Sequence, residues 1–251
     1  MSRPPAQTDA TAPANAGQAS AGNNKAAPQI GPGRPKDLNK RAAILDAARR
    51  MFIPNGFEGP TMDHIAAEAG VSKLTVYSHF GDKDALYITV VKEYCEQSLP
   101  TQLFHPSPET PLRERLLTIA KAFFTMISSP EAITGHRVMC SPKLKESHLP
   151  AQFWEAGPQR IQNAFADLLV RRQRAGELDV PGPHLAGWQF FTLPKGELQA
   201  QLVLGCCNPN APIDVPSHLE ASVDMFLSAY GVRAAATASR AAQHRSVPGQ
   251  A

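Results

Sequence analysis

The stretch 61–80 limits what this 251-residue chain can fold into more than any other part of it. Thr61 and Ser72 stand where two helix N-caps are expected, and Gly70 stands where a helix end needs a left-handed residue. The apolar residues fall at helical spacing around the glycine: Met62, Ile65, Ala66 and Ala69 before it, Val76 and Phe80 after it. The spacing predicts a helix-turn-helix whose second helix is free to enter the major groove of DNA.

The exposed face of that second helix carries side chains that suit a nucleic acid. If Val76 and Phe80 point into the core, the opposite face and the flanks hold Lys73, Leu74, Thr75, Tyr77, Ser78 and His79. Lysine, tyrosine and histidine can bind phosphate oxygens, and short side chains can approach base edges. For each residue alone, an ordinary solvated helix surface is the alternative. Their combination with Gly70 favours DNA contact.

Positive charge is clustered just before this motif, although the net charge of the chain is only +3. The cluster consists of Arg34, Lys36, Lys40, Arg41, Arg49 and Arg50, and within that stretch it faces only Asp37 and Asp46. Such a cluster suggests contacts with backbone phosphates, and a solvated helix face is the alternative. The segment around Arg34 and Lys36 is either an arm laid along DNA or the end of the preceding tail.

Several other classes of protein are not indicated. The chain shows no apolar run near the ~18 to 20 residues that span a bilayer and no signal-peptide core, which predicts a cytoplasmic protein. Its four cysteines, Cys95, Cys140, Cys206 and Cys207, lack paired spacing, and we interpret them as free buried thiols. No metal-ligand set, nucleophile elbow or phosphate-binding glycine loop is present, so we expect no metal, no cofactor and no enzyme activity.

Composition and periodicity divide the chain into four parts. Residues 1–36 hold almost no large apolar side chains and are predicted to be disordered, as is the tail 233–251. Residues 37–94 form the predicted DNA-binding domain, beginning with a helix from Leu38 to about Asn55 that Gly56 ends. Residues 95–232 form a second helical domain. Lys83 follows the predicted N-cap Asp82, where the helix dipole disfavours a cation, and a DNA phosphate would be a suitable partner.

The residues between 38 and 94 resemble the N-terminal domain of the tetracycline-repressor (TetR) family. The resemblance rests on Gly56-Phe57, Thr61, Ile65-Ala66, Ala69-Gly70-Val71-Ser72, Thr75-Val76-Tyr77, His79-Phe80 and Lys83-Asp84-Ala85-Leu86. It implies an all-α homodimeric regulator that binds a palindromic DNA operator and a small-molecule effector. The predicted DNA-binding set is Thr61, Lys73, Leu74, Thr75, Tyr77, His79 and Lys83, with Arg34 and Lys36. Leu74 departs from the family, because many members carry glycine there.

Helix signals continue through the second domain. We expect helices opened by Pro111, by Pro158 and by Pro183, the last one kinked or broken at Pro194. Ser217 and Glu220 predict a capping box for the final helix. The segments Glu155-Ala-Gly-Pro-Gln-Arg160 and Gly176-Glu-Leu resemble the C-terminal domain of the AefR-like branch of the family. The last two helices are unusually apolar, and we expect them to pair with a second subunit.

Large side chains in the second domain suggest an effector pocket. The candidates are Phe123, Phe124, Trp154, Arg160, Trp188 and Phe191, and for any one of them simple core packing is the alternative. The sequence therefore predicts a homodimeric repressor that a small molecule releases from its operator. The alternative is a DNA-anchored protein-interaction module or enzyme domain without a small-molecule inducer.

Overall fold

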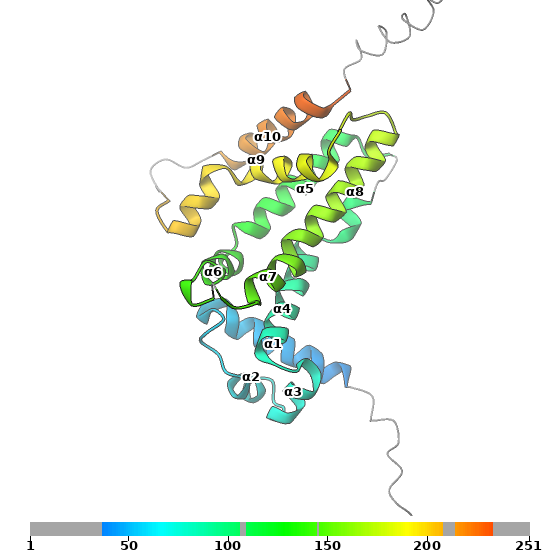
Figure 1. Cartoon of the computed structure of the whole chain (residues 1–251). Coiled ribbons are helices and arrows are strands. Elements are labelled where there is room, and N and C mark those ends of the chain that lie inside the picture. Colours follow the sequence, from blue (N-terminus) through cyan, green and yellow to red (C-terminus); the bar gives the residue numbers. More distant parts are fainter. Residues whose placement is uncertain (1–36, 106–108, 145, 208–213, 233–251) are drawn as a thin grey trace, which may run out of the picture. The chain divides into compact units, whose positions relative to one another are not determined.

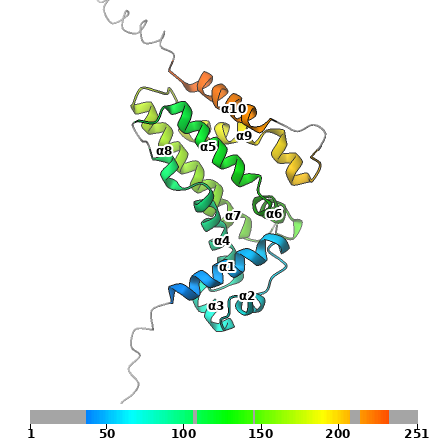
Figure 2. The ribbon, with the colours of Figure 1, turned by 180° about the vertical axis from the view of Figure 1, so that it is seen from behind.

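The structure is a computed structural model, and it describes residues 37–105, 109–144, 146–207 and 214–232 (Figures 1 and 2). In these ranges the secondary structure is helical, apart from one isolated antiparallel bridge between Leu178 and Gly231. The all-α prediction is therefore confirmed. No single helix in these ranges is long and apolar enough to cross a membrane. Two consecutive helices, Leu112–Ile127 and Pro130–Met139, pass the same test of length and composition together, but they are bent by 66°.

Four helices build the first part of the described chain: α1 (Leu38–Asn55), α2 (Met62–Glu68), α3 (Lys73–Phe80) and α4 (Lys83–Ser98). Side-chain caps define where they begin, as Asp37 accepts from the backbone of α1 and Asp82 from that of α4. Gly56 ends α1 at a φ of +66°. The four helices enclose a core that includes Ile44, Ile65 and Val76.

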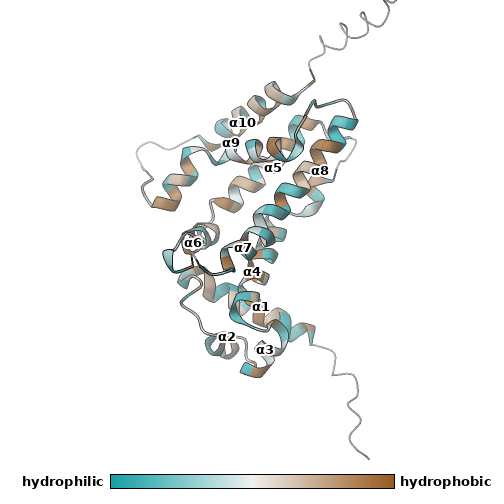
Figure 3. Cartoon of the chain, viewed as in Figure 1, coloured by the Kyte–Doolittle hydropathy of each residue, from teal (hydrophilic) through white to brown (hydrophobic). Residues whose placement is uncertain are grey.

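The remaining elements are η1 (Thr101–Phe104), α5 (Leu112–Ile127), α6 (Pro130–Met139), η2 (Pro142–Leu144), α7 (Leu149–Trp154), η3 (Glu155–Gln159), α8 (Arg160–Arg174), α9 (Pro183–Leu204) and α10 (Val215–Tyr230). Helix α9 packs against α8, α5 and α10. Figure 3 shows hydrophilic and hydrophobic patches alternating along α8, as expected for a helix with one buried face. Phe165, Phe190 and Phe226 meet at the centre of this second core.

Three local predictions for the second core need correction. Pro158 does not open a helix but lies inside the π-helical turn η3, and α8 begins at Arg160. The break in α9 falls at Gly196, two residues after Pro194, where glycine adopts φ +49°. The predicted capping box of Ser217 and Glu220 is wrong, because Asp214 caps α10.

The boundary between the predicted domains stays a prediction. The buried side chains form two clusters, and half-buried Val91 on α4 packs against both. The two predicted disordered tails lie outside the described residues. The interpretation of all four cysteines as buried is wrong for three of them: Cys95 is buried, whereas Cys140, Cys206 and Cys207 are exposed.

Candidate nucleic-acid interface and effector cavity

The turn between α2 and α3 is built by backbone geometry at one residue. Gly70 has φ +64°, and a Cβ built there would meet nothing within 4 Å. The requirement for glycine is therefore conformational and not one of space. The backbone N–H of Val71 donates to the carbonyl of Ala66 at 3.0 Å and closes the end of α2.

Side-chain caps fix both helices of the motif. Thr61 Oγ1 accepts from the backbone N–H of His64 at 3.2 Å, and Ser72 Oγ accepts from that of Thr75 at 3.2 Å. Buried Val76 and Phe80 then hold α3 against the core. The predicted helix-turn-helix and both of its N-caps are confirmed.

The outer face of α3 is open. Leu74 is 79% exposed and Tyr77 is 41% exposed. Lys73 Nζ lies 2.9 Å from Asp63 and 5.9 Å from the centre of the Tyr77 ring. Its hydrogen bond to Asp63 and the charge of that carboxylate raise the pKa of Lys73, which stays protonated at neutral pH. This face presents a large apolar side chain, an aromatic ring and a cation.

Two sequence models of known families match the chain at these elements. The model described as bacterial regulatory proteins of the tetR family matches residues 44–90, and the model described as the C-terminal domain of AefR-like transcriptional repressors matches residues 114–232. The chain belongs to the TetR family. The family consists of transcriptional regulators, and this confirms the prediction that the chain is not an enzyme.

Individual TetR-family proteins show the same similarity. The chain is 32% identical to the HTH-type transcriptional activator FasR of Mycolicibacterium smegmatis over 138 residues, which are 55% of this chain and 61% of FasR. A crystal structure from Mesorhizobium loti, described as a TetR-family transcriptional regulator, aligns with a TM-score of 0.67 at 26% identity and covers 78% of this chain and 98% of that one. The flavonoid-responsive regulator FrrA aligns with a TM-score of 0.63 at 28% identity, covering 79% and 100% of the two chains.

The matches with curated TetR-family relatives are partial. This chain spans 31% to 61% of the length of the first three of them. Further relatives are named HTH-type transcriptional repressors. The similarity therefore establishes the family, whereas the activity and the partners of the whole protein belong to the proposals below.

The described residues that were predicted to bind DNA lie on or next to α2, α3 and the start of α4. Thr75 already shares a hydrogen bond with Ser72. By contrast, the Nδ1 atom of His79 is buried without a hydrogen-bond partner in the described residues. Thr61 serves as the cap of α2. Arg34 and Lys36 lie outside the described residues. The DNA contacts of all these residues stay predictions.

Lys83 has a partner that the sequence did not suggest. Its Nζ donates to the Glu58 carbonyl at 3.3 Å and lies 4.6 Å from the centre of the Phe57 ring. Burial lowers the pKa of Lys83. The carbonyl and the ring explain why a cation is tolerated in the first turn of α4, so DNA phosphate is not needed to account for it.

The basic cluster of α1 is less available to phosphate than its sequence indicates. Arg41 forms an ion pair with Glu93 at 3.2 Å, and Arg50 forms one with Glu68 at 3.0 Å and another with Asp46. Carboxylates of α2 and α4 therefore pair with two arginines of the cluster. Asp37 and Asp46 are the only acidic residues within the stretch itself, and the sequence does not reveal that Glu68 and Glu93, far from it in the chain, pair with its arginines.

A cavity of about 360 Å³ lies among α1, α4, α5, α6, α7, η3, α8 and α9, within the size range of small-molecule sites. Most of its lining is apolar. Of the predicted ligand-binding residues, Phe123, Trp154 and Phe191 line it, and the rings of Phe123 and Phe191 lie 4.6 Å apart. Phe124 is buried elsewhere in the core, and Trp188 is 57% exposed; neither lines the cavity.

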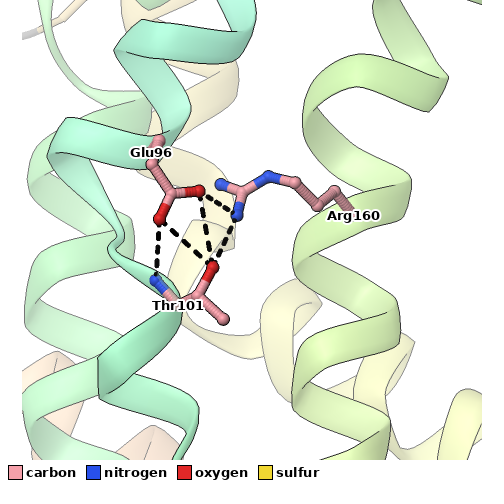
Figure 4. Close-up of polar contacts among 3 residues, drawn as sticks. All are labelled: Glu96, Thr101 and Arg160. Atoms are coloured by element: carbon pink, nitrogen blue, oxygen red, sulfur yellow. Dashed lines mark hydrogen bonds and ion pairs between the residues drawn. The ribbon is translucent and has the colours of Figure 1, made fainter.

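The remaining predicted ligand residue, Arg160, is used in a structural network instead (Figure 4). Its guanidinium forms an ion pair with Glu96 and donates to Thr101 Oγ1 at 3.1 Å. The Thr101 backbone N–H, with a further contribution from Arg160, lowers the pKa of Glu96. The network ties the beginning of α8 to the end of α4, outside the cavity lining.

Sequence reasoning missed several polar cavity residues, among them Arg49, Glu131, Gln162 and Lys195. Nothing in the local sequence marks Gln162. Lys195 did leave a signal, since only it and Glu197 are charged in the apolar stretch 186–207. In the part of the chain that the structure describes, no group of His, Cys, Asp and Glu could hold a metal ion.

Proposed function

We propose that this TetR-family protein is a homodimeric transcriptional repressor that acts on DNA in the cytoplasm and leaves a palindromic operator when a small molecule binds. One observation carries the proposal: α3 exposes Leu74, Tyr77 and Lys73 on a helix whose other face is buried. An exposed helix of this kind, fixed by a capped turn, is what the major groove admits.

Exposed apolar side chains on the last two helices support a dimer. Trp188 on α9 and Met225 on α10 are 57% and 60% exposed, and Leu185 on α9 is also exposed. Large apolar side chains gathered on neighbouring helices are typical of a surface that a second subunit covers. Two copies related by a two-fold axis would present two α3 helices to two operator half-sites.

Contacts of α6 supply a route from the cavity to the DNA-binding helices. Gly135 and His136 line the cavity, whereas Val138 lies against the end of α1, where a Cβ built on Gly56 would be 2.9 Å from Val138 Cγ2. Phe52 of α1 lines the cavity too. A ligand that moves α6 would therefore shift α1 and change the separation of the two α3 helices. Half-sites lie about one DNA turn, ~34 to 36 Å, apart, so a shift of a few ångströms would lose one of them.

The DNA-binding part of the proposal is tested by selecting genomic fragments with the purified full-length protein. We expect enrichment of a palindromic sequence and its loss for Tyr77→Ala. Leu204→Ala removes an apolar side chain that is 76% exposed, against 41% for Tyr77, at the end of α9, and should select the same fragments as the wild type. If the wild-type protein enriches no sequence, the proposed function is wrong.

The dimer is tested by analytical ultracentrifugation at micromolar concentration. The wild-type protein should sediment as a dimer, and Met225→Arg should sediment as a folded monomer, because the arginine would be buried unpaired at the interface. Leu38→Arg places the same charge on an exposed site of α1 and should remain dimeric. A monomeric wild type would contradict the two-fold operator arrangement.

A second candidate function is activation of transcription in place of repression. FasR is named an activator, so activation by this chain is the alternative to repression. In vitro transcription from a promoter containing the selected site separates the two. Fewer transcripts on adding protein are expected for a repressor, and more would assign the activator.

A further inference from the structure

Lys195 brings a cation to a cavity that is otherwise mostly apolar. It follows Pro194 on α9, and its Nζ lies 5.9 Å from the centre of the Phe123 ring. Part of the residue is exposed, but burial of its ammonium group lowers the pKa of Lys195. The charge therefore lies against an aromatic wall of the cavity and is not fully hydrated.

No carboxylate neutralises this charge within the described residues. None of the ion pairs or hydrogen bonds there includes Lys195 Nζ. Glu131 also lines the cavity, but its charge acts on Tyr94, whose pKa is raised by burial and then by Glu131. Burial and the charge of Lys195 lower the pKa of His136, so its imidazole is neutral at pH 7. A desolvated cation without a counterion is costly, and an anionic ligand group would remove that cost.

A second polar group in the cavity also lacks a partner. Gln162 Oε1 is buried and has no hydrogen-bond donor in the described part of the chain. Gly187 leaves room for this oxygen, since a Cβ there would lie 3.2 Å from it. An O–H or N–H group on a ligand would satisfy Gln162 while the ligand body packs on Phe123 and Phe191.

Building on the proposed function, we propose that the effector is an apolar molecule with one anionic oxygen group, and that Lys195 binds this group inside the cavity. The apolar part of the effector would pack on Phe123, Met126 and Phe191. The cavity volume of about 360 Å³ limits the effector to the lower end of the size range of small-molecule ligands. Either a carboxylate or a phenolate would supply this anionic oxygen. Although Lys195 is exposed as a whole, it lines the cavity and burial lowers its pKa, so it would meet such a group in a partly desolvated site, where charge-assisted hydrogen bonds are strong.

The test measures binding to the full-length protein by calorimetry, without DNA, using probes matched in shape but not in charge. The pairs are decanoate with decanamide, 2-naphthoate with 2-naphthamide, and 4-nitrophenolate with 4-nitroanisole. At least one anion should bind roughly tenfold or more tightly than its neutral partner, the effect of one hydrogen bond to a charged group. The pair that shows the preference identifies the carboxylate or the phenolate as the source.

Variants assign the preference to its side chain. Lys195→Met should bind the neutral probe as the wild type does but lose the preference for the anion, whereas Lys195→Arg should keep it. Lys121→Met removes an exposed lysine from α5 outside the cavity and should behave as the wild type. The proposal is overturned if no anion is preferred by the wild type, or if Lys195→Met retains the preference. Genomic fragment selection is a separate measurement, so failure of the DNA-binding proposal is distinguished from failure of this one.

Discussion

The helix-turn-helix and the C-terminal helices hold their charged side chains in different ways. Beside α3, Lys73 pairs with Asp63, and both side chains are 58% exposed. Between α8 and the segment that follows it, Arg172 pairs with Glu177 while only 4% of the arginine side chain is exposed. Lys195 in the cavity belongs to neither type, because it has no carboxylate partner in the described residues.

The difference indicates what each charge can do. An exposed ion pair gains little over two solvated ions, so Lys73 can exchange Asp63 for a DNA phosphate at low cost. A buried pair is strongly coupled to the fold, because removing one partner leaves the other charge unsolvated. Under the two proposals above, DNA binding would exchange the partner of Lys73, whereas effector binding would supply a partner to Lys195.

The largest effect is expected where the pair is most buried. Glu177→Ala removes the carboxylate that accepts two hydrogen bonds of 3.0 Å from Arg172 Nη1, and within the described residues this leaves the Thr110 carbonyl as the hydrogen-bond partner of the guanidinium. We expect the free energy of unfolding to fall by about 3 kcal/mol, the low end for a broken buried pair, because Glu177 is partly exposed. Urea denaturation measures it. An unchanged urea midpoint would show that the Arg172–Glu177 pair contributes as little to stability as an exposed ion pair.

The next largest effect is a loss of stability at alkaline pH. It is expected from two buried groups that line the cavity, Cys95 and Tyr87. Burial raises the pKa of Cys95 from 9.0 to about 11 and that of Tyr87 from 10.0 to about 12. Between pH 9 and 11 the unfolded chain releases the Cys95 proton while the folded protein keeps it, so stability falls by on the order of 2 to 3 kcal/mol.

Denaturation curves recorded from pH 8 to 12 test this origin. Cys95→Ala should lose the decrease that begins near pH 9 and keep the later decrease from Tyr87. The exposed cysteine variant Cys140→Ala should follow the wild type at every pH. If the Cys95→Ala curve runs parallel to that of the wild type, the thiol is not the group that titrates.

A smaller effect is expected from the uncharged residue at the centre of the exposed α3 face. Leu74 can contact the thymine C5-methyl group, the large apolar feature of the major groove. Leu74→Gly should weaken binding to the selected operator by roughly 1 to 2 kcal/mol, as measured by gel shift. Replacing the matching thymine by uracil should remove most of this difference. Equal binding of both proteins to both DNAs would leave Leu74 as ordinary surface.

The smallest effect tests partner exchange itself. Asp63→Asn frees Lys73 without moving it far, so we expect no measurable change in unfolding but tighter non-specific DNA binding with a steeper salt dependence, by up to about one unit in the log–log slope. Asp167→Asn changes the net charge equally on an exposed site of α8 and serves as the control. Identical slopes for both variants would show that Lys73 does not reach phosphate.

The sequence predicts the helix-turn-helix well because its determinants are local. Thr61, Gly70 and Ser72 act on backbone groups no more than five residues away, so their spacing alone defines the helix ends. The partners of Lys83 cannot be predicted in this way, since Glu58 lies 25 residues from it. The cavity is less predictable still, because Lys195 of α9 comes to lie near the Phe123 ring of α5 only when the two helices pack together.

The start of α10 shows why even a local signal can fail. Both Asp214 and Ser217 offer an oxygen that can cap a helix. In the structure Asp214 accepts from the Ser217 backbone N–H at 3.2 Å and also from the Ser217 hydroxyl at 2.6 Å. The carboxylate is the stronger acceptor, and the serine hydroxyl becomes its donor. The two candidates compete, and charge decides between them.

The π-helical turn η3 at Glu155–Gln159 has a consequence for the phase of the helices it joins. In an uninterrupted α-helix, Gln162 would point about 120° away from Pro150 around the axis, at about 100° per residue. A π turn accommodates one additional residue and turns everything after it back by about 100°. Pro150 and Gln162, both cavity residues, are thereby brought nearly into line. Changing this turn to α-helical geometry at unchanged length would keep α8 helical, yet rotate Gln162 by about 100° out of phase with α7.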